Sequence, residues 1–178
     1  PNLLPITYYL LPITYYPSLT ELDMIKQDPI TVQLAKTLPA LFRERVKRTP
    51  QQVAYRYFDK TQKAWQSLTW AEMSAQVARW QTALARENLV PGDRVAIMLP
   101  NSPQWVMFDQ AALGLGLVTV PLYPDDRPDN VAYIIAEAGV KLLLLEGAKS
   151  WQRLYTVRDE LSSLTRIVSA QAFDDQAF

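Results

Sequence analysis

The stretch Val90–Glu146 constrains the fold most, because apolar runs alternate there with segments of helical periodicity. The runs Arg94–Leu99, Leu117–Leu122 and Leu142–Leu145 are apolar almost throughout, which is typical of parallel strands buried on both faces. Between the last two, Val131–Ala138 carries apolar residues at i, i+3, i+4 and i+7, as one face of a helix does. The sequence therefore predicts an α/β fold: a partial doubly wound, mainly parallel sheet with helices on both faces.

A β-hairpin is predicted before this stretch. Val53–Phe58 and Ala64–Leu68 read as two strands around a turn at Asp59–Lys63. Thr69 and Glu72 then have the spacing of a capping box, which predicts a helix beginning there. Apolar residues at alternating spacings of three and four along this helix favour core packing over an aromatic ligand platform. They are Trp70, Met73, Val77, Trp80 and Leu84.

Two further helices are expected near prolines. A short helix with Pro39 in its first turn has an apolar face formed by Leu38, Leu41, Phe42 and Val46. We interpret its charged residues as a solvated face rather than an anion site. These are Arg43, Glu44, Arg45, Lys47 and Arg48.

The turn after Arg94–Leu99 has two interpretations. Asn101 or Ser102 can cap a helix that has Pro103 in its first turn. The turn would also lie on the ligand side of an open α/β sheet. A plain cap is the simpler of the two interpretations, and the residues alone leave both open.

The loop after Leu117–Leu122 contains Asp125 and Asp126. Adjacent carboxylates without a third ligand nearby favour a solvated turn over a metal or acid–base pair. Asp129 is predicted to cap the helix Val131–Ala138, and Gly139 to end it.

The remaining signals concern the ends of elements. The glycines of Gly114–Gly116 end a helix instead of opening one, so they are a helix stop and not a dinucleotide fingerprint. Beyond Gly147, one more helix is expected from Trp151 to Leu161, and one short strand at Arg166–Val168.

Composition excludes several classes of site. The 178 residues contain no cysteine and no histidine, so neither a zinc site of the usual kinds nor a Ser-His-Asp or Cys-His triad can form in this chain. Lys+Arg and Asp+Glu are equal at 18 each, which disfavours nucleic acid as a partner. No apolar run approaches the roughly 20 residues that cross a bilayer, and no signal peptide opens the chain. A cytoplasmic location fits these features.

Residues 1–36 are interpreted as an N-terminal tail, and residues 37–178 as one domain. The tail carries a tandem repeat, because Leu3–Tyr9 recurs as Leu10–Tyr16. Three interpretations of the repeat remain open: a local duplication or artefact, an added edge strand, and an interfacial membrane contact.

Ordered motifs between about Thr37 and Val168 resemble the opening of adenylate-forming enzymes, and most of all AMP-forming long-chain fatty acid–CoA ligases. Trp105–Gly114 and Val120–Pro124 favour the long-chain branch. The motifs are Pro91–Leu99, Asn101–Trp105, Gly114–Gly116, Val120–Pro124 and Val131–Ile134.

The resemblance implies that the chain is the truncated N-terminal subdomain of such a ligase. The parent would activate a fatty acid with ATP and magnesium through an acyl-adenylate and transfer it to coenzyme A. Its nucleotide motifs have no counterpart here, so we name no catalytic, cofactor-binding or metal-binding residue and expect the chain alone to be inactive. We also expect homo-oligomers through exposed edges. The alternatives are a fatty acyl-AMP ligase, another adenylation domain, or a non-catalytic α/β binding domain.

Overall fold

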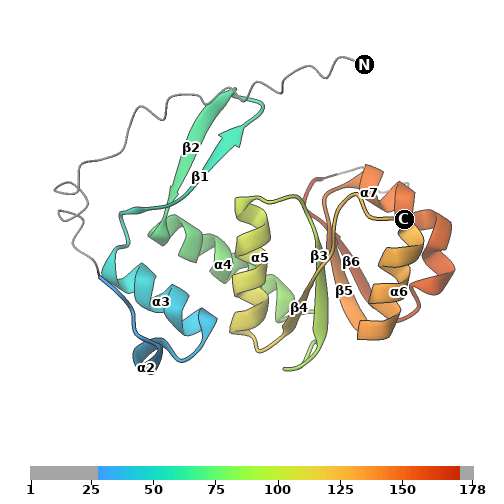
Figure 1. Ribbon diagram of the computed structural model, residues 1–178, viewed down its shortest axis with the longest axis horizontal. Coiled ribbons are helices and arrows are strands. Elements are labelled where there is room, and N and C mark those ends of the chain that lie inside the picture. The colour runs from blue at the N-terminus through green and yellow to red at the C-terminus, as the bar shows by residue number, and fades with distance from the viewer. Residues whose placement is uncertain (1–27, 173–178) are drawn as a thin grey trace, which may run out of the picture.

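The structure, a computed structural model, describes residues 28–172, and the tandem repeat lies outside them. Its centre is a parallel four-stranded sheet in the order β4-β3-β5-β6 (Figure 1). The parallel strands confirm the predicted α/β fold. Their bounds are β3 Arg94–Met98, β4 Val118–Pro121, β5 Val140–Leu145 and β6 Arg166–Ser169.

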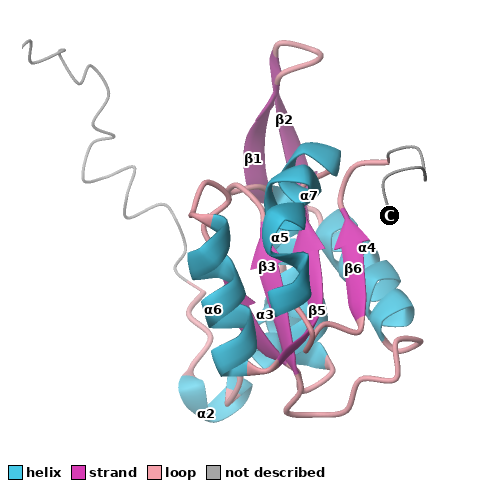
Figure 2. Ribbon diagram, turned by 90° about the vertical axis from the view of Figure 1, so that its right-hand side faces the viewer, coloured by secondary structure: helices cyan, strands magenta, loops and turns pink. Residues whose placement is uncertain are grey.

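Helices cover both faces of the sheet (Figures 1 and 2). On one face, Val95 and Ile97 of β3 pack in a core with the helices that follow the hairpin and β3. On the other face, Ala96 and Met98 pack with the helices that follow β4 and β5. This alternation confirms the doubly wound arrangement. The first face has α4 Trp70–Leu84 and α5 Pro103–Gly114, and α3 Leu38–Arg48 packs on these two helices on the side away from the sheet. The second face has α6 Pro128–Ala138, α7 Ala148–Leu154 and the 3-10 helix η1 Tyr155–Glu160.

The predicted hairpin is confirmed as a separate two-stranded antiparallel sheet, β1 Val53–Asp59 and β2 Ala64–Thr69. Trp70, at the start of α4, joins the base of the hairpin to α3 through edge-to-face contacts. Its ring centroid lies 5.9 Å from that of Phe42 and 6.0 Å from that of Tyr55. The hairpin is therefore fixed to the helical layer through aromatic side chains.

Caps delimit the helices largely as the sequence predicts. Thr69 Oγ1 accepts a hydrogen bond from the Glu72 N–H at 3.2 Å, and Glu72 Oε2 accepts one from the Thr69 N–H at 2.8 Å. Ser102, rather than Asn101, caps α5 by accepting from the Trp105 N–H at 3.3 Å. Gly139 ends α6 in the left-handed conformation with φ +59°.

Asp129 does not cap α6, and that prediction is wrong. The helix begins at Pro128, so that Arg127, two residues before Asp129, takes the N-cap position. Proline favours the first helical position because its fixed φ suits the helix and its missing N–H is not needed there. Asp129 lies in the first turn and pairs with Arg127. The helix predicted over Trp151–Leu161 also divides, since α7 ends at Leu154 and a 3-10 helix follows.

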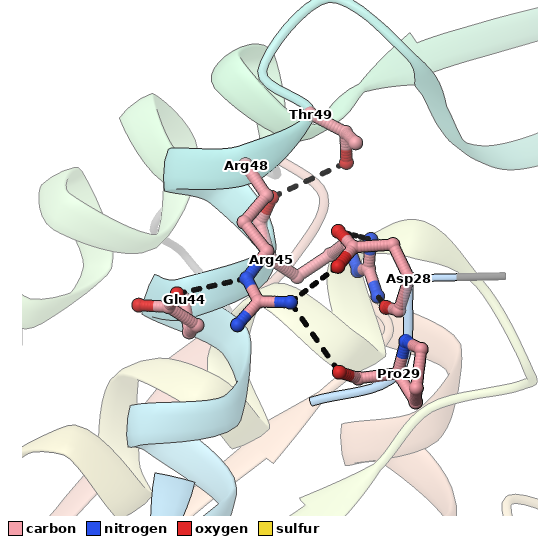
Figure 3. Close-up of polar contacts among 6 residues, drawn as sticks. All are labelled: Asp28, Pro29, Glu44, Arg45, Arg48 and Thr49. Atoms are coloured by element: carbon pink, nitrogen blue, oxygen red, sulfur yellow. Dashed lines mark hydrogen bonds and ion pairs between the residues drawn. The ribbon is translucent and has the colours of Figure 1, made fainter. Parts of the chain in front are cut away.

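The charged side of α3 is only partly a solvated face (Figure 3). Arg43 and Lys47 are exposed, as expected. Arg45 donates to the Asp28 backbone carbonyl at 2.6 Å, and Arg48 pairs with the Asp28 carboxylate and with Glu44. These two arginines bind the segment that precedes α2 (Val32–Ala35) to α3.

Candidate functional site

The carboxyl edge of the parallel sheet is the candidate functional site, because the turns after β3, β5 and β6 meet there. Open α/β folds bind ligands in the crevice outside this edge. A hollow of about 150 Å³ lies at the edge, next to the N-terminus of α5. It is lined by Leu99, Pro100, Ser102, Gln104, Glu146, Ala170 and Gln171.

Glu146, which follows β5, and Gln171, which follows β6, form one wall of this hollow. The Gln171 N–H donates to the Glu146 carbonyl at 2.9 Å, which continues the β5–β6 pairing past the end of the strands. The Gln171 side-chain amide also donates to Glu146 Oε1 at 3.4 Å. Glu146 and Gln171 also line a second hollow at this edge. Its lining residues are Glu146, Gly147, Ala148, Lys149, Ser150, Gln171 and Ala172.

Gly147 allows Gln171 to lie this close to the chain. A Cβ at position 147 would be 2.9 Å from Gln171 Oε1 and 3.5 Å from Gln171 Cβ. A larger residue would therefore push the Gln171 side chain away from the Glu146 carboxylate.

The turn after β3 forms the predicted cap, and its role on the ligand side of the sheet stays a prediction. Ser102 caps α5, and the turn also lines the hollow at the carboxyl edge. The Ser102 hydroxyl oxygen accepts the Trp105 N–H, which leaves its O–H donor and a second lone pair for other partners.

The aspartates after β4 are held within their own loop. Arg153 of α7 donates to the carbonyls of Pro124 and Asp126 at 2.6 and 2.7 Å. Asp126 Oδ1 accepts from the Arg127 N–H at 2.8 Å, whereas the fully exposed Asp125 lies 3.7 Å from Arg153. This geometry matches the predicted turn. Among residues 28–172, no three histidine, cysteine or acidic residues converge as a metal site.

At the opposite, amino edge of the sheet, charged side chains form ion pairs and hydrogen bonds between neighbouring elements. Asp93 is only 6% exposed, its carboxylate lies 2.7 Å from Lys141 Nζ, and it accepts the Val90 N–H at 2.9 Å. The Lys141 ammonium and the Val90 N–H lower the pKa of Asp93. Arg94 donates to the Ala138 carbonyl at 2.7 Å. These contacts link the turn before β3, the end of α6 and the start of β5 at the amino edge.

The groups that line the two hollows at the carboxyl edge are mainly polar and include both signs of charge. They comprise one carboxylate, two hydroxyls, two amides and the exposed ammonium of Lys149. Sequence reasoning missed Glu146 and Gln171 as site residues. Their position directly after parallel strands was the signal that could have identified them.

The comparisons with known proteins agree on one family. The family model described as AMP-binding enzyme matches residues 42–177. A solved Mycobacterium tuberculosis fatty acyl CoA synthetase is 27% identical with a TM-score of 0.67, over 76% of this chain and 26% of that one. A nonribosomal peptide synthetase of Aspergillus fumigatus is 32% identical over 128 residues, and a probable CoA ligase of Humulus lupulus is 31% identical over 102. These cover 71% and 57% of this chain.

The chain is short beside these proteins. It spans 6% of the Aspergillus synthetase and 16% of the Humulus ligase. No helix among the described residues is long and apolar enough to cross a membrane.

Proposed function

The chain belongs to the AMP-binding enzyme family, and on that premise we propose that it forms the N-terminal part of an enzyme that activates a carboxylic acid with ATP. The observation that carries this proposal is the likeness of the whole α/β layer arrangement to a fatty acyl CoA synthetase, with a TM-score of 0.67 over 76% of the chain. The hollows at the carboxyl edge lie on the side of the sheet where such folds bind ligands.

The proposed reaction has two steps. A carboxylate oxygen of the acid attacks the α-phosphorus of ATP, the bond to the β-phosphate breaks, and pyrophosphate leaves. The sulfur of coenzyme A then attacks the carbonyl of the acyl-adenylate, the thiol proton is lost, and AMP leaves. Both steps place negative charge on phosphate oxygens, which cations and N–H donors stabilise.

In this proposal the chain serves as the platform, and other parts of the parent hold ATP and magnesium. The platform's contribution is rigidity. Both cores contain residues of β3 and β5, and side chains such as Phe108 and Leu144 are fully buried. A rigid sheet keeps the turns at its carboxyl edge in a constant geometry, as the positioning of substrates requires.

A fatty acid is the first candidate for the acid, with coenzyme A as acceptor. The structural likeness to a fatty acyl CoA synthetase and the long-chain motifs at Trp105–Gly114 and Val120–Pro124 support this branch. A cytoplasmic location fits the proposal, because ATP and coenzyme A are available there. A fatty acyl-AMP ligase would share the first step and differ only in the acceptor.

An amino acid is the second candidate. The nonribosomal peptide synthetase of Aspergillus fumigatus, 32% identical over 71% of this chain, favours it. The two candidates share the first chemical step, so the N-terminal platform fits both of them.

The experiment that separates the candidates is ATP–pyrophosphate exchange by the parent protein. We expect exchange with long-chain fatty acids such as palmitate, and none with a panel of the twenty amino acids. Exchange with an amino acid alone would replace the first candidate by the second. Exchange with neither would overturn the proposed activation of an acid.

We also propose that the isolated chain self-associates through the edges of its sheet. Strands β4 and β6 form the two edges, and Val118 on β4 is 46% exposed. Unpaired edges and exposed apolar side chains recruit partners. Light scattering should show dimers or larger species as the concentration approaches millimolar. A monomer at every concentration would contradict this proposal.

A further inference from the structure

A groove that lies apart from the carboxyl edge follows α3 and consists of two adjoining hollows. The first, of about 290 Å³, lies between α3, β1, α4 and α5, and the second, of about 360 Å³, lies between α2 and α3. Ile30, Leu38 and Leu41 line both hollows, so the two form one groove, the α3 groove. Its lining residues all differ from those of the hollows at the carboxyl edge.

The α3 groove leaves apolar side chains open to water. Val32 is 77% exposed and Leu38 is 61% exposed, although both are aliphatic. Ile30, Leu41 and Phe42 continue the apolar lining toward the aromatic rings of β1 and α4. A ligand with an apolar chain would remove these side chains and its own surface from water, which is the main free energy that such a groove offers.

One wall of the α3 groove is fixed by two arginines (Figure 3). Arg45 donates to the Asp28 carbonyl at 2.6 Å, and Arg48 donates to the Pro29 carbonyl at 3.3 Å. These bonds hold the segment that ends at Ile30 against α3. The groove is therefore formed before a ligand arrives, and binding does not have to order this wall.

The two charged residues in the lining differ in how they are paired. Arg45, in the first hollow, lies 3.3 Å from the Asp28 carboxylate. Lys36, in the second hollow, is exposed, and its ammonium forms no ion pair or hydrogen bond with any residue from 28 to 172. The flexible four-carbon stem of a lysine lets its ammonium reach a group at the mouth of the groove. The α3 groove thus has a mainly apolar end and an end with one unpaired positive charge.

We propose that the α3 groove binds a long-chain fatty acid anion, whose alkyl chain lies on Leu38 and Leu41 and whose carboxylate pairs with Lys36. The two ends of the groove match the two ends of such a ligand, because apolar side chains accept the alkyl chain and one free cation accepts a single negative charge. The choice of a fatty acid rests on the proposed function, whereas the need for an apolar chain with one negative charge rests on the groove. The site is a second place for the substrate, apart from the hollows at the carboxyl edge.

Fatty acids of different length test the apolar part of the proposal. NMR titration of the 178-residue chain with laurate, without ATP and below the critical micelle concentration, should show saturable binding with shifts at Val32, Leu38 and Leu41. Laurate should bind at least about tenfold more tightly than hexanoate, because its longer chain buries more CH₂ groups. No saturable binding, or equal affinity for the two acids, would overturn the proposal.

The head group is tested with 1-dodecanol, which has a chain of the same length as laurate and no charge. Lys36→Gln removes the cation, and Lys47→Gln, at an exposed position of α3 outside the lining, is the matched control. Lys36→Gln should weaken laurate binding by about two- to fivefold, as expected for one exposed ion pair, and leave 1-dodecanol binding unchanged. Lys47→Gln should change neither. Unchanged laurate binding in Lys36→Gln, or an equal loss for both ligands, would contradict the assigned ion pair.

Leu38→Gln tests the place of the alkyl chain, at a position that is exposed and tolerates a polar residue. It should weaken laurate and 1-dodecanol binding alike, and unchanged affinities would contradict the site. Shifts confined to Ser102 and Gln171 would place the fatty acid at the carboxyl edge. That result would overturn the α3 groove as the site and leave the proposed acid activation intact, since ATP–pyrophosphate exchange by the parent tests the activation separately.

Discussion

At the scale of single residues, Asp93 shows how one side chain joins two strands. It lies directly before β3, accepts the Val90 N–H of its own turn, and pairs with Lys141 of β5. Because the charged form of Asp93 receives both contacts, its pKa in the folded chain lies below the ordinary value of 3.8. The pair therefore stabilises the fold only where the carboxylate is ionised.

Acid unfolding should reveal this contribution. Below about pH 4 the unfolded chain binds the proton of Asp93 before the folded chain does, so the free energy of unfolding falls as the pH is lowered. Asp93→Asn should be less stable at pH 7 and should lose less stability on acidification. Urea titrations at pH 7 and pH 3 measure both effects, with Asp159→Asn at an exposed position as control. Parallel pH profiles for Asp93→Asn and the natural chain would count against this role.

The capping box of α4 gives a second prediction at this scale. Thr69→Ala removes the oxygen that accepts the Glu72 N–H, and should lower the free energy of unfolding by about 1 kcal/mol. Thr61→Ala, in the exposed turn of the hairpin, should change it little. Urea denaturation of both variants makes the comparison. The role assigned to the cap fails if the two variants are equally stable.

At the scale of elements, Gly139 sets the junction between α6 and β5. Its φ of +59° disfavours residues with a side chain. A Cβ there would also be 2.9 Å from the guanidinium of Arg94, which donates to the Ala138 and Gly139 carbonyls. One residue thus permits both the left-handed turn and the contact that ties α6 to β3.

Gly139→Ala should therefore destabilise the chain by about 1 kcal/mol or more. Gly139→Asn should cost less, because asparagine adopts the left-handed conformation more readily. Thermal unfolding of the two variants beside the natural chain tests this order. A variant with alanine as stable as the natural chain would show that the turn tolerates a side chain.

The elements themselves were largely predictable from the sequence. Apolar runs such as Leu142–Leu145 can be satisfied only by burial on both faces, which implies parallel strands with helical covers. Boundaries were harder: Pro128 competes with Asp129 for the start of α6, and the helix expected through Leu161 gives way to a 3-10 turn. Local preferences of comparable strength decide such ends.

At the scale of the whole molecule, the sites depend on residues that are distant in sequence. Glu146 and Gln171 meet because β5 and β6 are paired. Another hollow, between α3, β1, α4 and α5, is lined by residues that lie as far apart in the sequence as Ile30 and Gln110. No local pattern connects these positions with one another, so the sequence could point to the residues that follow each strand but not to which of them meet. Arg45 and Arg48 were misread for the same reason, since their partner Asp28 lies 17 and 20 residues away.

We propose that this chain is the platform of an acid-activating enzyme, and that the nucleotide-binding groups belong to other parts of the parent. ATP–pyrophosphate exchange by the purified 178-residue chain, with palmitate, ATP and magnesium, tests it most directly. We expect no exchange above a heat-inactivated control, because the proposal assigns the groups that hold the phosphates to other parts of the parent. Exchange above that control would contradict it.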